Sequence, residues 1–526
     1  MSDVADDPHA GWKPAGNPWL IAVAVTIATF MEVLDTTIVN VALPHIAGSL
    51  SASTDEATWV LTSYLVANGI VLTISGWLGD LLGRKRYFVI CIGMFTVFSF
   101  LCGSAQSLAQ LIVFRLAQGF FGGGMQPNQQ SIILDTFAPA RRGAAFGVAA
   151  MATIVAPVLG PTLGGFITDQ SSWRWIFFLN IPIGIIAVFL VAALVEDPPW
   201  VRERKSRGMD FIGLSLIAIG LGSLEVMLDR GEEADWFGSV FIRVMAVAAF
   251  VGIVGAIMWL SVARRPIVHL AVFKDRNFAT GCLMIAATGG ILYASAVMIP
   301  QLAQEYLNYT ATWAGLILSP GGLMVIILIP IVGRLLRITP ARNLIAAGFT
   351  IMGFAMLYSS HLAANINFGL LVSMRLFQTT ALAFLFVPIS TVAYLTLPRD
   401  LNPDGVALFA MFRNVAGSVG IALSTSYVAR RAQTHQSVLA DLATPFRQPF
   451  KELVANYAHS LSAMGHSAAS AQQMALGKIY LMIRTEAAIM AYADTYVACA
   501  MVAFMVAPFA FLMTARKSAG GPGAAH

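Results

Sequence analysis

Charged residues are scarce in this chain. They make up 11% of its 526 residues, whereas 57% are hydrophobic and the mean hydropathy is +0.74. A soluble domain would carry roughly twice that charged fraction. The hydrophobic residues form repeated runs of about 20, the length at which a helix crosses a bilayer. The composition therefore excludes a soluble protein with a large core and predicts an all-α integral membrane protein.

Cysteines and cofactor motifs are scarce as well. No two of the four cysteines have metal-ligand spacing, so neither a zinc site nor a disulfide framework is predicted. The phosphate-binding pattern G-x-x-x-x-G-K-[ST] is absent, which argues against an ATP-driven pump. The acidic N-terminal tail lacks the basic flank and cleavage site of a signal peptide. We therefore expect a retained first span, no cofactor, no bound metal and, despite a net charge of +5, no nucleic-acid partner.

Fourteen apolar runs are long enough to be membrane spans. Arginine and lysine cluster in loops on one side of these spans, as at 84–86 and 141–142, which predicts that this side is cytoplasmic. An even number of spans then places both termini in the cytoplasm. The predicted spans are 18–43, 57–79, 87–105, 109–134, 143–168, 173–195, 211–229, 240–262, 278–300, 313–335, 342–360, 367–397, 405–429 and 488–514.

The two ends of the chain resemble each other. "LIVFRLAQG" at 111–119 matches "LVSMRLFQT" at 371–379, which aligns Arg115 with Arg375 and Gln118 with Gln378. Chance similarity between apolar segments is the alternative, but prolines follow both segments at nearly the same spacing. The repeat predicts two related six-helix halves, as in transporters whose halves rock about a central site.

The predicted domain organisation follows from this repeat. Two inserted helices separate the halves, and residues 430–485 form either a small helical cap or a flexible outer loop within the second half. The predicted boundaries are a cytoplasmic tail (1–17), an N-terminal six-helix half (18–196), a cytoplasmic linker (197–210), two inserted helices (211–263), a second cytoplasmic linker (264–276), a C-terminal six-helix half (277–514) and a cytoplasmic tail (515–526).

Two carboxylates lie inside the first predicted span. In "FMEVLDTTIVNVALP" at 30–44, Glu32 and Asp35 are three residues apart and share a helical face. A carboxylate in hydrocarbon is costly unless it faces a polar cavity or is protonated. Arg115, inside the fourth span, is expected to pair within a cavity for the same reason. The two carboxylates are candidates for proton coupling, although Glu32 could instead be a helper or a residue of the cavity wall.

Other polar residues inside the spans are candidates for a substrate cavity. In "MQPNQQS" at 125–131, interhelical hydrogen bonding is an equally good interpretation. Two acids of the seventh span, Glu225 and Asp229, are interpreted as an interfacial face. The predicted cavity residues are Tyr64, Asn68, Gln118, Gln126, Gln129, Arg375 and Gln378.

The loop after the second span carries "GWLGDLLGRKR" at 76–86. Its glycines permit close helix approach and a tight turn, while Asp80 lies at the negative end of a helix and needs a partner. An arginine or the positive N-terminus of the thirteenth span could serve as the partner of Asp80. The pattern resembles the signature of the major facilitator superfamily. The resemblance implies an inner gate formed by Gly76, Asp80, Gly83, Arg84, Arg86 and Asp135.

The fifth span contains "APVLGPTLGG" at 156–165, which resembles the antiporter motif of the same superfamily. The match consists of Gly160, Pro161, Gly164 and Gly165. "LDTTIVNVALP" at 34–44 and "LDRGEEADWF" at 228–237 resemble the fourteen-span drug:proton antiporters of the EmrB/QacA branch. The resemblance implies two six-helix halves plus two inserted helices, fourteen in all, in the inner membrane of a bacterium. "LIVFRLAQGFFGGG" at 111–124 resembles the fourth-span motif of the superfamily, which implies that Arg115 takes part in proton coupling. The resemblance also implies a periplasmic adaptor and an outer-membrane duct as partners, although the sequence has no docking motif for them.

These observations predict a proton-coupled antiporter that exports hydrophobic or amphipathic small molecules by alternating access, with the proton gradient as its energy source. The alternatives are an uptake permease, an exporter of one specific metabolite and, in a different class, an integral membrane enzyme. No cluster of nucleophiles, metal ligands or paired acids supports an enzyme, so we predict none. The tenth span lacks the acid that some relatives use for bis-cationic drugs, so neutral, anionic or weakly cationic lipophiles are expected.

Overall fold

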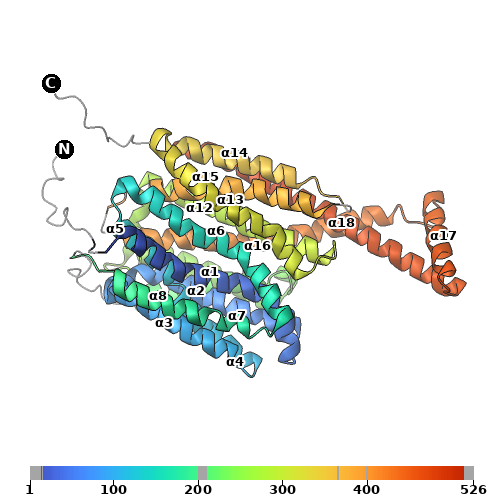
Figure 1. The fold of residues 1–526 in the computed structure, drawn as a ribbon, viewed down its shortest axis with the longest axis horizontal. Helices are drawn as coiled ribbons and strands as arrows, with labels where there is room; N and C mark the ends of the chain where they lie inside the picture. The colour runs from blue at the N-terminus through green and yellow to red at the C-terminus, as the bar shows by residue number, and fades with distance from the viewer. Residues whose placement is uncertain (1–13, 15, 200–209, 364–365, 399–400, 514–526) are drawn as a thin grey trace.

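The structure is a computed structural model that describes residues 14, 16–199, 210–363, 366–398 and 401–513. Every regular element within these ranges is a helix (Figure 1). Twelve of the helices are long and apolar enough to span a membrane, and a thirteenth, α6, qualifies if its two bent segments are counted together. The prediction of an all-α membrane protein is therefore confirmed.

The N-terminal half begins where local sequence favours helix starts. Asn17 Oδ1 accepts a hydrogen bond from the Trp19 amide at 2.9 Å, and Pro18 occupies the first turn. Ser53 and Glu56 form a capping box at the second helix. The helices of this half are α1 (Pro18–Ser49), α2 (Thr54–Leu82), α3 (Arg84–Gly103), α4 (Leu108–Gly122), α5 (Met125–Thr136), α6 (Pro139–Gln170), α7 (Trp175–Phe178) and α8 (Asn180–Leu194).

The fourth predicted span is not one continuous helix. It consists of α4 and α5, separated at Gly123 and Gly124. A Cβ atom at Gly123 would clash with the backbone of Asn68, and one at Gly119 would clash with the backbone of Tyr64. The glycines thus allow this chain segment to cross α2 closely. Fourteen spans are reached only if α4 and α5 count as one broken span, so that number is plausible but not exact.

The inserted pair consists of α10 (Phe211–Arg230) and α11 (Val240–Val262), joined by a loop that contains the short helix η1 (Trp236–Gly238). α10 packs against α2 of the first half and α16 of the second. Glu225, interpreted from sequence as interfacial, is buried at this junction with 5% exposure. The insertion therefore contacts both halves rather than lying apart from them.

The C-terminal half follows a 3-10 helix, η2 (Leu270–Lys274). Asp275 caps its first helix by accepting a hydrogen bond from the Phe278 amide at 2.8 Å. In Figure 1 this half lies beside the N-terminal half, with the two sets of helices running in similar directions. Its helices are α12 (Arg276–Glu305), α13 (Ala311–Ile338), α14 (Ala341–Ser359), α15 (Phe368–Ala393), α16 (Asn402–Ala440), α17 (Gln448–Ala463) and α18 (Ala468–Val506), which η4 (Ala507–Leu512) ends.

Two helices of this half are too long for the bilayer alone. α16 and α18 each have 39 residues, or about 58 Å at 1.5 Å per residue, against a hydrocarbon core of about 30 Å. Together with α17 they form a helical extension that projects from the bundle, at the end opposite α5 (Figure 1). Residues 430–485, for which the sequence allowed either a helical cap or a flexible loop, are mostly helical in the structure.

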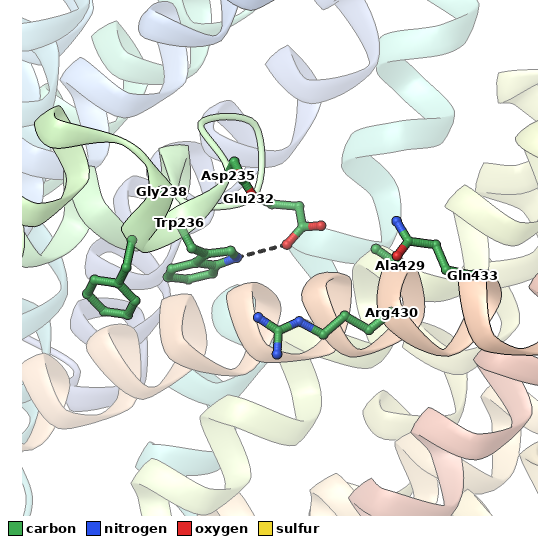
Figure 2. Close-up of a pocket in the computed structure, with 8 residues that line it drawn as sticks. Glu232, Asp235, Trp236, Gly238, Ala429, Arg430 and Gln433 are labelled. Atoms are coloured by element: carbon green, nitrogen blue, oxygen red, sulfur yellow. Dashed lines mark hydrogen bonds between the residues drawn. The ribbon is translucent and has the colours of Figure 1, made fainter.

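The loop of the inserted pair rests on this extension (Figure 2). Trp236 Nε1 lies 2.9 Å from Glu232 Oε2 and 2.8 Å from Ser426 Oγ of α16. Ser426 also donates to Glu232 at 2.5 Å. A pocket of about 370 Å³ opens beside these residues, with Arg430 on its α16 wall. The contacts hold the insertion to the base of the extension.

Candidate functional site

Asp35 and Arg115 form a buried ion pair. Asp35 comes from α1 and Arg115 from α4, neither side chain is exposed, and Arg115 Nη1 lies 2.5 Å from Asp35 Oδ2. Arg115 Nε also donates to the Val60 carbonyl at 3.2 Å, and the guanidinium lies 4.1 Å from the centre of the Tyr64 ring. Removing either charge would leave the other uncompensated in the protein interior, which is strongly unfavourable.

Two amides complete the surroundings of Asp35. Gln118 Nε2 and Asn180 Nδ2 donate to Asp35 Oδ1 at 3.2 and 2.7 Å. Asn180 Nδ2 also donates to Ser99 Oγ at 3.0 Å. The aspartate thus connects α1 to α3, α4 and α8. Because protonation of Asp35 would neutralise its ion pair, a single proton could change how these helices are held together.

Glu32 lies one turn earlier on α1 and has different neighbours. It is 1% exposed, and its Oε1 accepts hydrogen bonds from Tyr64 OH at 3.3 Å and from Asn68 Nδ2 at 3.1 Å. Its Oε2 accepts one from Gln126 Nε2 at 2.8 Å. No ion pair is formed by Glu32 within the described ranges. The two carboxylates share a helical face, as predicted, but only Asp35 pairs with a cation.

Gln126 connects Glu32 to the second half of the molecule. Its Nε2 donates to Glu32, and its Oε1 accepts a hydrogen bond from Arg413 Nη2 of α16. Arg413 is 1% exposed. A carboxylate of the N-terminal half and a guanidinium of the C-terminal half are therefore bridged by one amide at the interface between the halves.

The amides of α5 make the interhelical hydrogen bonds that sequence left as one of two interpretations. Each binds a different partner, so together they fix α5 between the two halves. Gln126 binds Glu32, Asn128 Nδ2 donates to the Arg84 carbonyl at 2.9 Å, Gln129 Nε2 donates to Thr26 Oγ1 at 3.0 Å, and Gln130 Oε1 accepts from Tyr394 OH at 3.1 Å.

The residues of the predicted inner gate gather at the end of the bundle near α5. Arg84 forms an ion pair with Asp135 and donates to the Ser131 carbonyl at 3.1 Å. Gly83 has φ +82°, a conformation that favours glycine, and it joins α2 to α3. Arg84 is thereby fixed against the end of α5.

The last turns of α2 meet the first turn of α16, across the two halves. A Cβ atom on Gly76 would lie 2.8 Å from the Pro403 carbonyl oxygen. Asp80, one turn further along α2, is partly buried, and Arg86 is exposed. The predicted approach of this motif to the N-terminus of the thirteenth span is therefore present in the structure.

The glycine-rich segment of α6 packs directly on α1. A Cβ atom on Gly164 would lie 2.8 Å from the Ile38 carbonyl oxygen, and one on Gly160 would clash with Thr37. Gly165 is also buried, and Pro161 lies in the second part of a helix that bends by 41° between Arg141–Pro157 and Leu159–Gln170. The motif thus sets the position of α1 within one turn of Asp35.

The sequence was compared with known protein families. The profile described as Major Facilitator Superfamily matches residues 25–421. The chain belongs to the major facilitator superfamily. The family prediction is confirmed, and the family and fold are those of membrane-embedded transporters of small molecules rather than of enzymes.

Individual relatives place this superfamily member in the EmrB-like branch. It is 39% identical to the multidrug export protein EmrB of Escherichia coli (strain K12) over 428 residues, 81% of this chain and 83% of that protein. It is 34% identical to the fatty acid resistance protein FarB of Neisseria gonorrhoeae, over 97% of this chain and 99% of FarB. A crystal structure of the peptide transporter POT shares the fold, with a TM-score of 0.57, 15% identity and coverage of 94% and 95% of the two chains.

The two halves of this superfamily member contain equivalent polar clusters. Arg375 Nη1 donates to Ser295 Oγ at 3.1 Å and to Gln378 Oε1 at 3.3 Å, and Gln378 Nε2 donates to Ser359 Oγ at 2.9 Å. These four residues lie 260 positions after Arg115, Asp35, Gln118 and Ser99, respectively. The repeat therefore extends to side-chain geometry, but a serine replaces the aspartate in the second half.

Three residues at these sites were missed by sequence reasoning. Arg413, Asn180 and Ser99 are not among the residues that the sequence motifs predict for the site. A signal for Arg413 and Asn180 was available, because each is a polar residue within an apolar run. Arg375 and Gln378, predicted to line the cavity, have their hydrogen-bond partners within the C-terminal half.

Proposed function

We propose that this protein is a proton-coupled antiporter that exports hydrophobic or amphipathic small molecules by alternating access. The observation that carries the proposal is the 39% identity to a multidrug export protein across 81% of the chain. The similarity to FarB over nearly the whole chain supports amphipathic substrates in particular. The proposal favours export over uptake and a broad substrate range over a single metabolite.

Asp35 would carry the coupling proton. In the charged state its ion pair with Arg115 holds α1 against α4, and its amide contacts hold α3 and α8. Protonation from outside would remove the ion pair, while Arg115 would keep its hydrogen bonds to Val60 and Gln118. A substrate that favours the deprotonated, inward-facing form would then compete with the proton and couple the two flows.

The energy source would be the proton gradient alone, without a cofactor. We place the protein in the inner membrane of a bacterium, with both termini in the cytoplasm. By analogy with relatives, a periplasmic adaptor and an outer-membrane duct would extend the export path, an argument from family membership rather than from a docking site.

The decisive experiment compares a strain that lacks the gene with the same strain carrying it. Export predicts lower accumulation and higher resistance to lipophilic compounds when the gene is present, abolished by a protonophore. Greater accumulation with the gene would indicate an uptake permease instead. Repeating the assay with and without a co-transcribed adaptor gene tests the partner separately.

A further inference from the structure

Arg413 is a buried cation whose donors are incompletely used. Its Nη2 donates to Gln126 Oε1 and its Nε to Asn414 Oδ1 at 3.2 Å, whereas Nη1 makes no hydrogen bond in the part of the chain that the structure describes. The side chain is 1% exposed. A buried donor without an acceptor is unfavourable by about 1–3 kcal/mol, and more when the group is charged.

Arg413 forms no salt bridge in the part of the chain that the structure describes, and its charge acts on Glu32 only across Gln126. Its hydrogen-bond partners in the described ranges are the amides of Gln126 and Asn414 and the side chain of Tyr293, all of them neutral. Arg115, in contrast, pairs with Asp35 at 2.5 Å. Gln126 lies between Arg413 and Glu32 and binds both. The amide keeps Glu32 from occupying the guanidinium and leaves that cation available to another anion.

Two aromatic side chains lie next to this guanidinium. Its central carbon lies 5.8 Å from the centre of the Phe386 ring on α15, and Tyr293 of α12 lies beside it. Gln126 reaches it from the other half of the molecule. A molecule bound here would lie between the two halves, where the alternating-access mechanism requires a substrate to lie.

We infer that Arg413 binds the anionic group of an exported amphiphile, with the apolar part against Phe386 and Tyr293, so that the preferred substrates are lipophilic carboxylic acids. This inference rests on the proposed export function and names its substrate class. The carboxylate would replace the Gln126 oxygen on Nη2 and also accept from Nη1, the two-point geometry for which a guanidinium is suited. Two other buried arginines in the described part of the chain, Arg115 and Arg375, also have an unused donor, but their hydrogen-bond partners lie within their own half of the molecule.

The test uses purified full-length protein and a matched pair of fluorescent probes, pyrenebutyric acid and its primary amide, which differ in charge but hardly in size. Wild-type protein is expected to bind the acid more tightly than the amide. Arg413→Gln should weaken acid binding roughly ten-fold or more, the loss of a charge-assisted hydrogen bond, and change amide binding by less than about three-fold. Arg413→Lys keeps the positive charge but loses the planar two-donor geometry of the guanidinium. It should bind the acid with an affinity between those of wild type and Arg413→Gln.

Arg447→Gln, at an exposed arginine of the extension, is the matched control and should bind both probes as wild type does. Equal binding of acid and amide by wild type, or equal loss of both in Arg413→Gln, would overturn the inference. If Arg413→Gln does not fold, the wild-type preference and the Arg413→Lys variant decide. Transport of both probes without preference refutes only the inference, whereas transport of neither probe, nor of any lipophilic drug, refutes the export function itself.

Discussion

At the scale of single residues, Asp35 and Ser295 occupy equivalent positions in the two halves. Each contacts the arginine that follows it by 80 positions, Arg115 at 2.5 Å and Arg375 at 3.1 Å. Only the first pair contains a carboxylate, because a serine stands at the equivalent position of the second half. The proposed proton carrier Asp35 therefore has no carboxylate counterpart in the second half, although the polar residues around it are duplicated.

Asp35→Asn is expected to abolish proton-driven efflux while substrate binding partly survives. The asparagine can keep hydrogen bonds to Gln118 and Asn180 but cannot bind a proton. The measurement is substrate-induced proton release from detergent-solubilised protein. Undiminished release from this variant would show that the proton travels elsewhere. Ser295→Ala, at the equivalent position of the second half, is the matched control and should release protons as wild type does.

Glu32→Gln is expected to have a milder effect that depends on the substrate. The glutamine keeps one acceptor oxygen for Tyr64 and Asn68, whereas its NH2 group would face the Gln126 Nε2 donor, so the network is preserved in part. Resistance to a panel of lipophilic compounds provides the readout. A loss of all efflux as complete as that of Asp35→Asn would instead make Glu32 an essential proton carrier.

At the scale of helices, the packing of α6 on α1 determines where the carboxylates lie. The glycines of α6 bring its backbone to the backbone of α1 near Thr37 and Ile38. On its other side α6 contacts α13 of the second half, where Thr162 Oγ1 lies 3.3 Å from Ser319 Oγ. α6 therefore connects the helix that carries Asp35 to the opposite half.

Gly164→Val should displace α1 and impair transport. Its Cβ atom would lie 2.8 Å from the Ile38 carbonyl oxygen, so the two helices must separate, and overpacking of this kind costs about 1–3 kcal/mol. We expect a lower unfolding temperature and reduced efflux at normal membrane abundance. Gly333→Val is the control, because a Cβ atom there has no neighbour within 4 Å. Wild-type behaviour of both variants would refute tight packing.

Asp80→Asn should impair transport while the protein remains in the membrane. It removes the charge at the end of α2, where that helix meets α16 of the other half, but changes little volume. Efflux and membrane abundance, measured together, separate loss of gating from loss of folding. Arg86→Gln alters an exposed charge of the same loop and serves as the control. Wild-type turnover of Asp80→Asn would mean that the loop only directs topology.

At the scale of the whole molecule, the gate residues and the helical extension lie at opposite ends. α5, which contacts Arg84 through Ser131 and Asn128, is at one end of the bundle, and α17 lies beyond the other (Figure 1). If the basic loops face the cytoplasm, the extension projects into the outer compartment. The shape shows only that the two features lie at opposite ends, and which end faces the cytoplasm is a prediction from the basic residues.

Cysteine accessibility labelling tests the orientation. In a background without the four native cysteines, a cysteine at Lys205 should react only after the membrane is made permeable. A cysteine at Ala455, on α17, should react in intact cells. The reverse labelling pattern would show that the molecule has the opposite orientation in the membrane, with the gate residues outside and the helical extension in the cytoplasm.

The sequence by itself determined the class of the molecule. Apolar runs separated by charged loops indicate membrane helices because burying charge in hydrocarbon is unfavourable. The motifs at 76–86 and 156–165 identified the superfamily, and the spacing of Glu32 and Asp35 placed both on one helical face. These features depend on local composition and helical periodicity, so they can be read without knowing which helices touch.

Only the tertiary structure decided how the polar residues are partnered. The sequence spacing of these residues does not show that Arg115 pairs with Asp35 rather than with Glu32. Nor does it show that Gln126 connects Glu32 to Arg413, which lies 287 residues after Gln126. The break between α4 and α5 likewise depends on the close crossing with α2 at Gly119 and Gly123. These pairings depend on which helices pack together. A buried polar group is unfavourable when it has no hydrogen-bond partner, and whether it finds one is determined only when the two halves assemble.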